Sequence, residues 1–129
     1  MADLQLWSMS AVEMADAVRT GDVSAQVLID SVLARIDQLN PRLNAYCTLM
    51  ADEARDAANQ ADADLAAGVE VGPLHGVPVS IKDNLYVKDS RTTFGSKLQE
   101  NDVTREDCPL VERLRRAGAI IIGRTNSPE

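Results

Sequence analysis

Apolar residues recur at helical spacing in the first third of the chain and predict two helices. Ser10 and Glu13 have the spacing of a capping box, and a short amphipathic segment follows them until Gly21. A second helix begins after Ser24 and carries an apolar stripe of about four turns. We expect it to end at Pro41, since the residue before a proline disfavours helical geometry.

The middle of the chain changes from a helical to an extended pattern. Residues 45–49 have the composition of a strand, and the alanine-rich residues 51–67 predict a helix that ends at Gly68. A short apolar run follows at residues 77–81, with glycine and proline before it and Asp83 after it. Such a run is typical of a buried strand.

A long polar stretch separates this strand from a second one. Residues 83–107 are too many for an ordinary connection, and loops of this length are usually functional or cover something. Pro109 begins a helix, Gly118 ends it, and residues 119–122 form a second buried strand. Since a strand, a crossover and a strand in one sheet close with a fixed hand, the two strands should be parallel and covered on both faces. The pattern therefore predicts an α/β fold with N-terminal helices followed by a βαβ unit.

Composition and charge agree with a single globular segment. The chain has 129 residues, in which residues 1–70 form a mainly helical lead-in and residues 71–129 form the strand, loop, helix and strand. Only 3% of the residues are aromatic, so the core must consist of valine, isoleucine, leucine and alanine. The formal charge of -7 argues against a nucleic-acid partner, because phosphate binding needs clustered cations.

The cysteines and the N-terminus indicate in which cellular compartment the protein lies. Cys47 and Cys108 lie far apart in the sequence and form no metal-binding spacing, so neither a disulfide framework nor a zinc site is expected. The first residues, Met1–Trp7, contain no basic region followed by an apolar stretch. No apolar run approaches the roughly 20 residues that cross a bilayer. We therefore expect a cytoplasmic protein that does not bind a membrane.

Lys82, at the end of the apolar run, is the main candidate for chemistry. A buried ammonium group loses hydration, which favours the neutral amine, and a neutral amine can take a proton from a nucleophile. Lys82 is therefore a candidate general base. The alternative is structural, since a lysine at a strand end commonly extends its charge into water.

Four other features are better explained by structure. Residues 118–125 match a phosphate-loop pattern with arginine in place of lysine, but their three isoleucines need burial, so we expect no cofactor. His75, the single histidine, has no second ligand at a recognisable spacing. Ser80 shares a strand face with Lys82, but no nearby glycine-rich loop supplies an oxyanion hole. Ser96 is expected to stabilise a turn.

Three motifs, in this order, resemble the amidase signature family. They are GPLHGVPVSIKDN at 72–84, RTTFGS at 91–96 and REDCPLVERLRRAGAIIIGRTNSPE at 105–129. The segments SAVEMADAVRTGDVS and LARIDQLNPRLNAY are also typical of the family's leading helices. The resemblance covers nearly the whole chain and corresponds to the N-terminal third of the family's domain. It implies that the βαβ unit belongs to a larger mixed sheet with helices on both faces.

The resemblance also implies a function. Members of this family hydrolyse amides with a Ser, cis-Ser, Lys triad through an acyl-enzyme, and Lys82 matches the lysine. The two serines come from later motifs, so we expect these 129 residues to be an inactive fragment that carries the catalytic lysine. The substrate implied for the intact enzyme is a small-molecule amide. The KDN and TNSPE variants look more like general amidases or aryl-acylamidases than like a component of an amidotransferase.

Two alternatives remain open. The first is the A subunit of a glutamine-dependent tRNA amidotransferase, which shares much of this N-terminal pattern and needs partner subunits. The second is a non-catalytic interaction module that pairs through its first two helices. Strand edges left without neighbours would favour self-association, and a homodimer is one arrangement that this leaves open.

Overall fold

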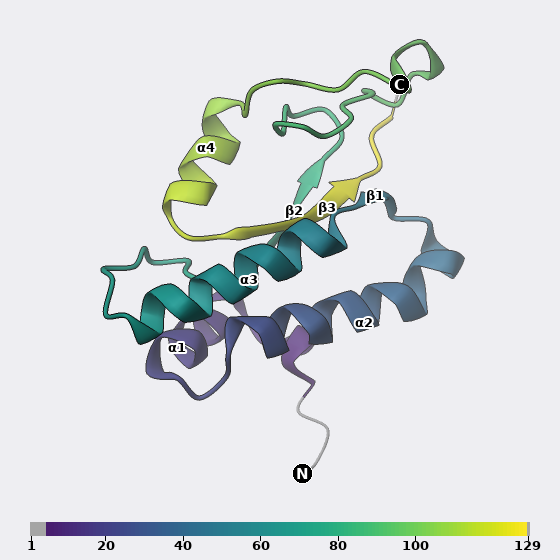
Figure 1. Ribbon diagram of the computed structural model, residues 1–129. Helices are drawn as coiled ribbons and strands as arrows, with labels where there is room; N and C mark the ends of the chain where they lie inside the picture. Colours follow the sequence, from purple (N-terminus) through teal and green to yellow (C-terminus); the bar gives the residue numbers. More distant parts are fainter. Residues whose placement is uncertain (1–4, 129) are drawn as a thin grey trace.

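A small sheet separates two layers of helix in the computed structural model, which describes residues 5–128 (Figure 1). Helices α1, α2 and α3 lie on one side of the strands and α4 on the other. Met1–Leu4 of the N-terminal segment and Glu129 of the third motif lie outside the described residues. The elements are η1 (Leu6–Ser8), α1 (Ala11–Thr20), α2 (Ala25–Leu43), β1 (Tyr46–Leu49), α3 (Ala51–Ala66), β2 (Pro78–Lys82), η2 (Lys97–Gln99), α4 (Pro109–Arg116) and β3 (Ile120–Thr125).

The first helix begins where the sequence predicts. The Ser10 Oγ accepts a hydrogen bond from the Glu13 amide at 3.1 Å, and the Ser10 amide donates to the Glu13 carboxylate at 2.7 Å. These two bonds form the expected capping box. Gly21 ends the helix in the left-handed region with φ 80°, where a glycine has no steric penalty.

The predicted end of the second helix is wrong by about one turn. α2 continues through Pro41 to Leu43, and Asn44 ends it in the left-handed region with φ 49°. The Asn44 amide donates to the Asn40 carbonyl at 2.6 Å. A proline removes only one amide donor, and near the last turn of a helix this loss is small.

The sheet has the strand order β1-β3-β2. β2 and β3 are parallel, which confirms the predicted βαβ unit, and β1 pairs with β3 in the antiparallel direction. The apolar pattern ends the second buried strand at residue 122, but β3 continues through Arg124 to Thr125. A charged residue usually indicates the end of a buried strand, whereas the Arg124 side chain is itself buried.

Side chains of β3 alternate between two apolar clusters. Ile120 and Ile122 join the cluster formed with α1, α2 and α3, and Ile121 joins the cluster formed with Val111 of α4. The prediction that both faces are covered is therefore confirmed for β3, whereas Ser80 and Lys82 of β2 are exposed on the face opposite Ile81. Ala54 and Ala58 of α3 are fully buried, so the alanine-rich helix packs closely rather than lying loosely on the surface.

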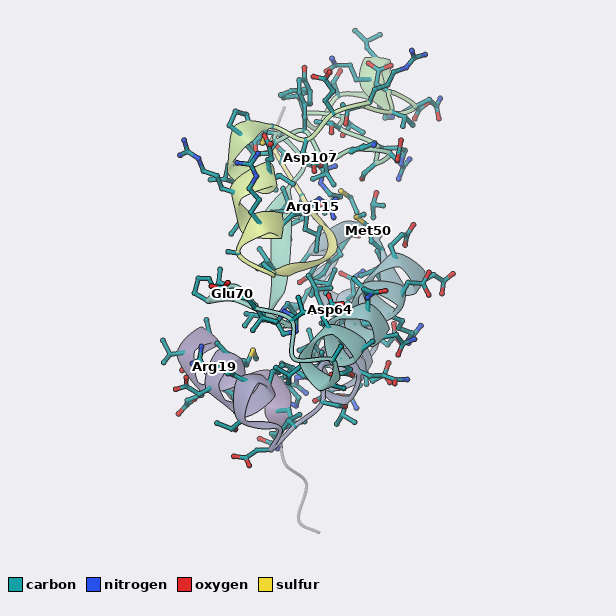
Figure 2. The ribbon with its side chains drawn as sticks, turned by 60° about the vertical axis from the view of Figure 1, so that its left-hand side comes forward. Arg19, Met50, Asp64, Glu70, Asp107 and Arg115 are labelled. Atoms are coloured by element: carbon teal, nitrogen blue, oxygen red, sulfur yellow. The ribbon has the colours of Figure 1, made fainter. Side chains whose placement is uncertain are left out.

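The long segment between β2 and α4 is irregular, as expected. Apart from η2, its backbone is held by an isolated bridge between Arg91 and Val103 and by bonds between its two branches. Its end is attached to α4, since the Arg115 Nε donates to the Asp107 carboxylate at 2.8 Å. Figure 2 shows Arg115 and Asp107 on the α4 side of the strands, and Asp64 of α3 on the other side. Within residues 5–128, no helix is both long and apolar enough to cross a membrane.

Candidate functional site

Lys82 is the last residue of β2 and lies at the carboxyl end of the parallel strand pair. Its partner in β3 is Thr125. The Lys82 side chain is exposed, so it is not buried in the way that the apolar run before it suggests. The reason is the alternation of the strand: Ile81 faces the α4 cluster, and its neighbours Ser80 and Lys82 face the opposite side, where both are exposed. In this chain the lysine extends into water.

Asp83, which directly follows Lys82, is buried with an exposed fraction of 3%. Its carboxylate accepts a hydrogen bond from the Thr93 amide at 3.0 Å and a second bond from the Thr93 hydroxyl. The Asp83 carbonyl accepts from the Phe94 amide at 3.0 Å. The RTTFGS motif is therefore attached to the residue beside the candidate base.

Arg124 is the largest fully buried side chain of the described residues, with an exposed fraction of 0%. Its guanidinium lies 3.9 Å from the Asp83 carboxylate and also donates to several backbone carbonyls and hydroxyl groups. Burial lowers the pKa of Arg124, and the nearby Asp83 charge acts in the opposite direction. An arginine nevertheless stays protonated in proteins, so the site contains a buried ion pair. The partners of the guanidinium are Lys82, Leu85, Ser90, Arg91 and Thr92.

Sequence reasoning missed Arg124 and the role of Asp83. One local signal exists, because a charged residue stands directly after a run of three isoleucines and a glycine. Arg124 also stands at the lysine position of the phosphate-loop pattern, where an exposed cation would be expected. Residues 118–125 form a turn and a buried strand, which agrees with the rejection of a phosphate loop.

The remaining candidates have structural roles. His75 is buried, and its Nε2 lies 2.8 Å from the Ala61 carbonyl oxygen. The Ser96 hydroxyl accepts from the Leu98 amide at 3.3 Å and caps η2, which confirms the predicted turn. The Ser80 hydroxyl is hydrogen-bonded to the Tyr46 hydroxyl of β1 rather than to a base.

A cavity of about 250 Å³ adjoins Asp83. Lys82 is not among the residues that line it. Cys47 is an exposed residue, but the partial burial of its thiol raises the pKa, with a smaller contribution from the Asp83 charge, so the thiol stays protonated near neutral pH. Within residues 5–128, no three His, Cys, Asp or Glu side chains are grouped to hold a metal ion. The residues that line the cavity beside Asp83 include Cys47, Thr48, Asp83, Arg91, Ser96 and Lys97.

Comparisons with known proteins give a consistent family. The family model described as Amidase matches residues 27–129. The chain is 41% identical to an indoleacetamide hydrolase of Bradyrhizobium diazoefficiens, over 96% of this chain and 24% of that protein. It is 40% identical to the A subunit of the glutamyl-tRNA(Gln) amidotransferase of Lachnospira eligens, over 98% of this chain and 26% of that protein. The chain thus spans about a quarter of the length of these curated relatives.

Solved structures agree with this result. A fatty acid amide hydrolase superposes with a TM-score of 0.91 at 25% identity, over 99% of this chain and 23% of that chain. A bacterial aryl acylamidase of the amidase signature family superposes with a TM-score of 0.89 at 27% identity, over 93% of this chain and 25% of that chain. The mixed α/β arrangement described above is therefore one that these enzymes contain.

Proposed function

The chain belongs to the amidase family, and on this premise we propose that its protein hydrolyses amides with Lys82 as the base of a Ser, cis-Ser, Lys triad. The observation that supports this role is the position of Lys82 at the carboxyl end of β2. Its side chain is exposed there, so serines from another part of the protein have access to it. Ligands of open α/β sheets bind outside the carboxyl ends of the strands.

In the proposed reaction Lys82 moves protons and forms no bond to the substrate. The nucleophilic serine attacks the amide carbonyl, its proton passes to the bridging serine, and the bridging serine gives its own proton to the Lys82 amine. The reverse transfer protonates the departing amine and leaves an acyl-enzyme. Water then releases the acid through the same relay, and every group returns to its starting state.

The proposal assigns the 129 residues a partial role. They form the N-terminal part of a larger amidase domain, with a helical lead-in over residues 1–70 and the lysine-bearing unit over residues 71–129. Both serines belong to motifs outside these residues, so the chain alone is inactive. The intact enzyme acts in the cytoplasm on a small-molecule amide. Self-association of the chain, with a homodimer as its simplest form, is also proposed, and analytical ultracentrifugation tests it.

A second candidate is the A subunit of a tRNA-dependent amidotransferase. It is favoured by the relatives, several of which carry that name at 35% to 43% identity. On this alternative the protein co-purifies with partner subunits and hydrolyses glutamine. A free-standing enzyme that accepts simple amides and purifies alone favours the first candidate.

The test uses Lys82→Ala in a protein that joins this segment to the serine-bearing motifs. We expect kcat for amide hydrolysis to fall between about 100-fold and 10,000-fold, the usual contribution of a general base. Lys88→Ala is the matched control, because Lys88 is an exposed lysine of the long loop. Retention of activity by Lys82→Ala would overturn the proposal. The purified 129-residue chain should show no hydrolysis in the same assay.

A further inference from the structure

We infer that Arg124 is a positioning residue for Lys82 and that Asp83 is its counterion. This inference rests on the proposed function of Lys82. Arg124 is fully buried and charged, and its two Nη groups donate to backbone carbonyls and hydroxyls, whereas its Nε has no hydrogen-bond partner. A buried guanidinium is costly to keep, so its contacts indicate what it stabilises.

The first contact is with the turn that follows Lys82. The Leu85 amide donates to the Lys82 carbonyl at 3.1 Å and closes this turn. The Arg124 Nη2 donates to the same Lys82 carbonyl at 3.3 Å and also to the Leu85 carbonyl. One nitrogen therefore binds the residues at both ends of the turn.

The second contact is with the opposite branch of the long loop. The Arg124 Nη1 donates to the Arg91 carbonyl at 2.7 Å and to the Ser90 hydroxyl at 3.0 Å. The planar guanidinium has five donors in a fixed arrangement, so it joins the two branches in one geometry. A lysine at this position has a single ammonium group and cannot reach both branches in the same way.

Asp83 completes the arrangement on the other side of the turn. Its amide donates to the Thr125 carbonyl at 2.9 Å, which extends the strand ladder by one residue beyond Lys82. Its carboxylate balances the Arg124 charge at 3.9 Å and holds Thr93. The backbone on the carboxyl side of Lys82 is thus held from β3 and from the loop, and this fixes the direction of the Lys82 Cα–Cβ bond, from which the side chain extends. A catalytic group must be held to within about 0.5 Å of its productive position.

The first experiment measures amide hydrogen exchange of Asp83 and Leu85 in the 129-residue chain. We expect Arg124→Met to reduce protection of these two amides at least tenfold. Arg116→Met is the matched control, because Arg116 is exposed and pairs with Glu112 on its own helix. Unchanged protection in Arg124→Met overturns the inference. If that variant does not fold, Asp83→Asn, which has the same shape, takes its place with the same expected direction.

The second experiment measures hydrolysis in a protein that joins this segment to the serine-bearing motifs. A misplacement of about 1 Å costs about 100-fold, so we expect kcat of Arg124→Met to fall by about 100-fold and KM to stay within twofold. Arg124→Lys should recover part of this loss because it restores the charge. Leu28→Ala serves as the control for a general loss of stability, because Leu28 belongs to the apolar cluster formed with α1, α2 and α3. We expect this variant to keep its kcat at temperatures where it is folded. Equal kcat values for Arg124→Met and Leu28→Ala overturn the inference.

These results are separable from a failure of the proposed function. If Lys82→Ala keeps its activity, the proposed function is wrong, and the exchange measurement still decides whether Arg124 holds the turn. If Lys82→Ala is inactive and Arg124→Met is fully active, the base is correct and the positioning role is wrong.

Discussion

The Tyr46 hydroxyl is hydrogen-bonded to the Ser80 hydroxyl, although β1 and β2 lie on opposite sides of β3. The tyrosine ring crosses β3 at Gly123, where an added Cβ would lie only 2.9 Å from the Tyr46 Cδ1. Ser80 is itself the partner of Gly123 in the parallel pair. One side-chain contact therefore joins all three strands next to Lys82.

Gly123→Ala should destabilise the chain because there is no room for a methyl group. The new Cβ would lie 2.7 Å from the Thr48 carbonyl oxygen as well as against the tyrosine ring. We expect a loss of about 1–3 kcal/mol in the free energy of unfolding, measured by urea titration. Tyr46→Phe keeps the ring and removes only the hydroxyl, so it should lose about 1 kcal/mol or less. Equal stability of Gly123→Ala and the unmodified chain would contradict the crossing.

Leucines at two positions should respond very differently to truncation. Leu28 of α2 has an exposed fraction of 1%, and Leu98 of η2 has an exposed fraction of 96%. Leu28→Ala should cost about 2–5 kcal/mol of unfolding free energy, since it leaves a cavity between helices. Leu98→Ala should stay within about 0.5 kcal/mol. Thermal and urea unfolding of the two variants measure the difference, and a large loss for Leu98→Ala would show that η2 is packed.

The first helix should depend on its capping box. Ser10→Ala removes the hydroxyl that accepts from the Glu13 amide, and we expect a loss of about 1 kcal/mol. Glu13→Gln keeps a side-chain acceptor for the Ser10 amide and should lose less. Urea titration of both variants checks this order. The reverse order would mean that the Glu13 charge, rather than the capping bonds, stabilises the helix end.

The Cys47 thiol should titrate at high pH. Since burial raises its pKa above 9.0 in the folded chain, the folded state binds the proton more tightly than the unfolded state. This contribution to stability is complete below the unfolded pKa and is lost as pH rises through the folded pKa. Cys47→Ala should therefore show a smaller decrease in unfolding free energy above about pH 9 than the unmodified chain.

The alkylation rate of Cys47 gives an independent measurement. In a Cys108→Ser variant, the rate as a function of pH should have its midpoint above 9.0. A midpoint below that value would contradict the assigned burial effect.

Local patterns predict the elements whose causes are local. The Ser10 capping box depends on residues three apart, and the alternation of Ile120, Ile121 and Ile122 depends on the period of a strand. The parallel direction of β2 and β3 follows from the long connection through α4, because parallel strands need a crossover. The capping box and the alternation are contained in short windows of sequence, and the crossover follows from the order of the elements, so all three can be predicted without the fold.

The arrangement around Lys82 depends on distant residues. In the sequence, Arg124 stands at the end of an apolar run, and nothing beside it predicts that it is buried. Its hydrogen-bond partners at Lys82, Ser90 and Arg91 lie more than 30 positions away. The exposure of Lys82 is predictable in part, since strand alternation places it opposite the buried Ile81. Which face of the sheet the helices cover depends on the tertiary structure. The thirteen residues of the GPLHGVPVSIKDN motif do not determine it.

The guanidinium of Arg124 also sets an order of events during protein synthesis. The hydrogen bond from Arg124 to the Lys82 carbonyl spans 42 positions of sequence. A ribosome adds about 5–20 residues per second, so Lys82 is made about 2–8 s before Arg124. Throughout this interval the turn has only its own bonds, such as the one from the Leu85 amide to the Lys82 carbonyl. The bonds from the guanidinium to both ends of the turn can form only after Arg124 has left the ribosomal exit tunnel, so this part of the geometry around Lys82 is completed late in translation of the segment.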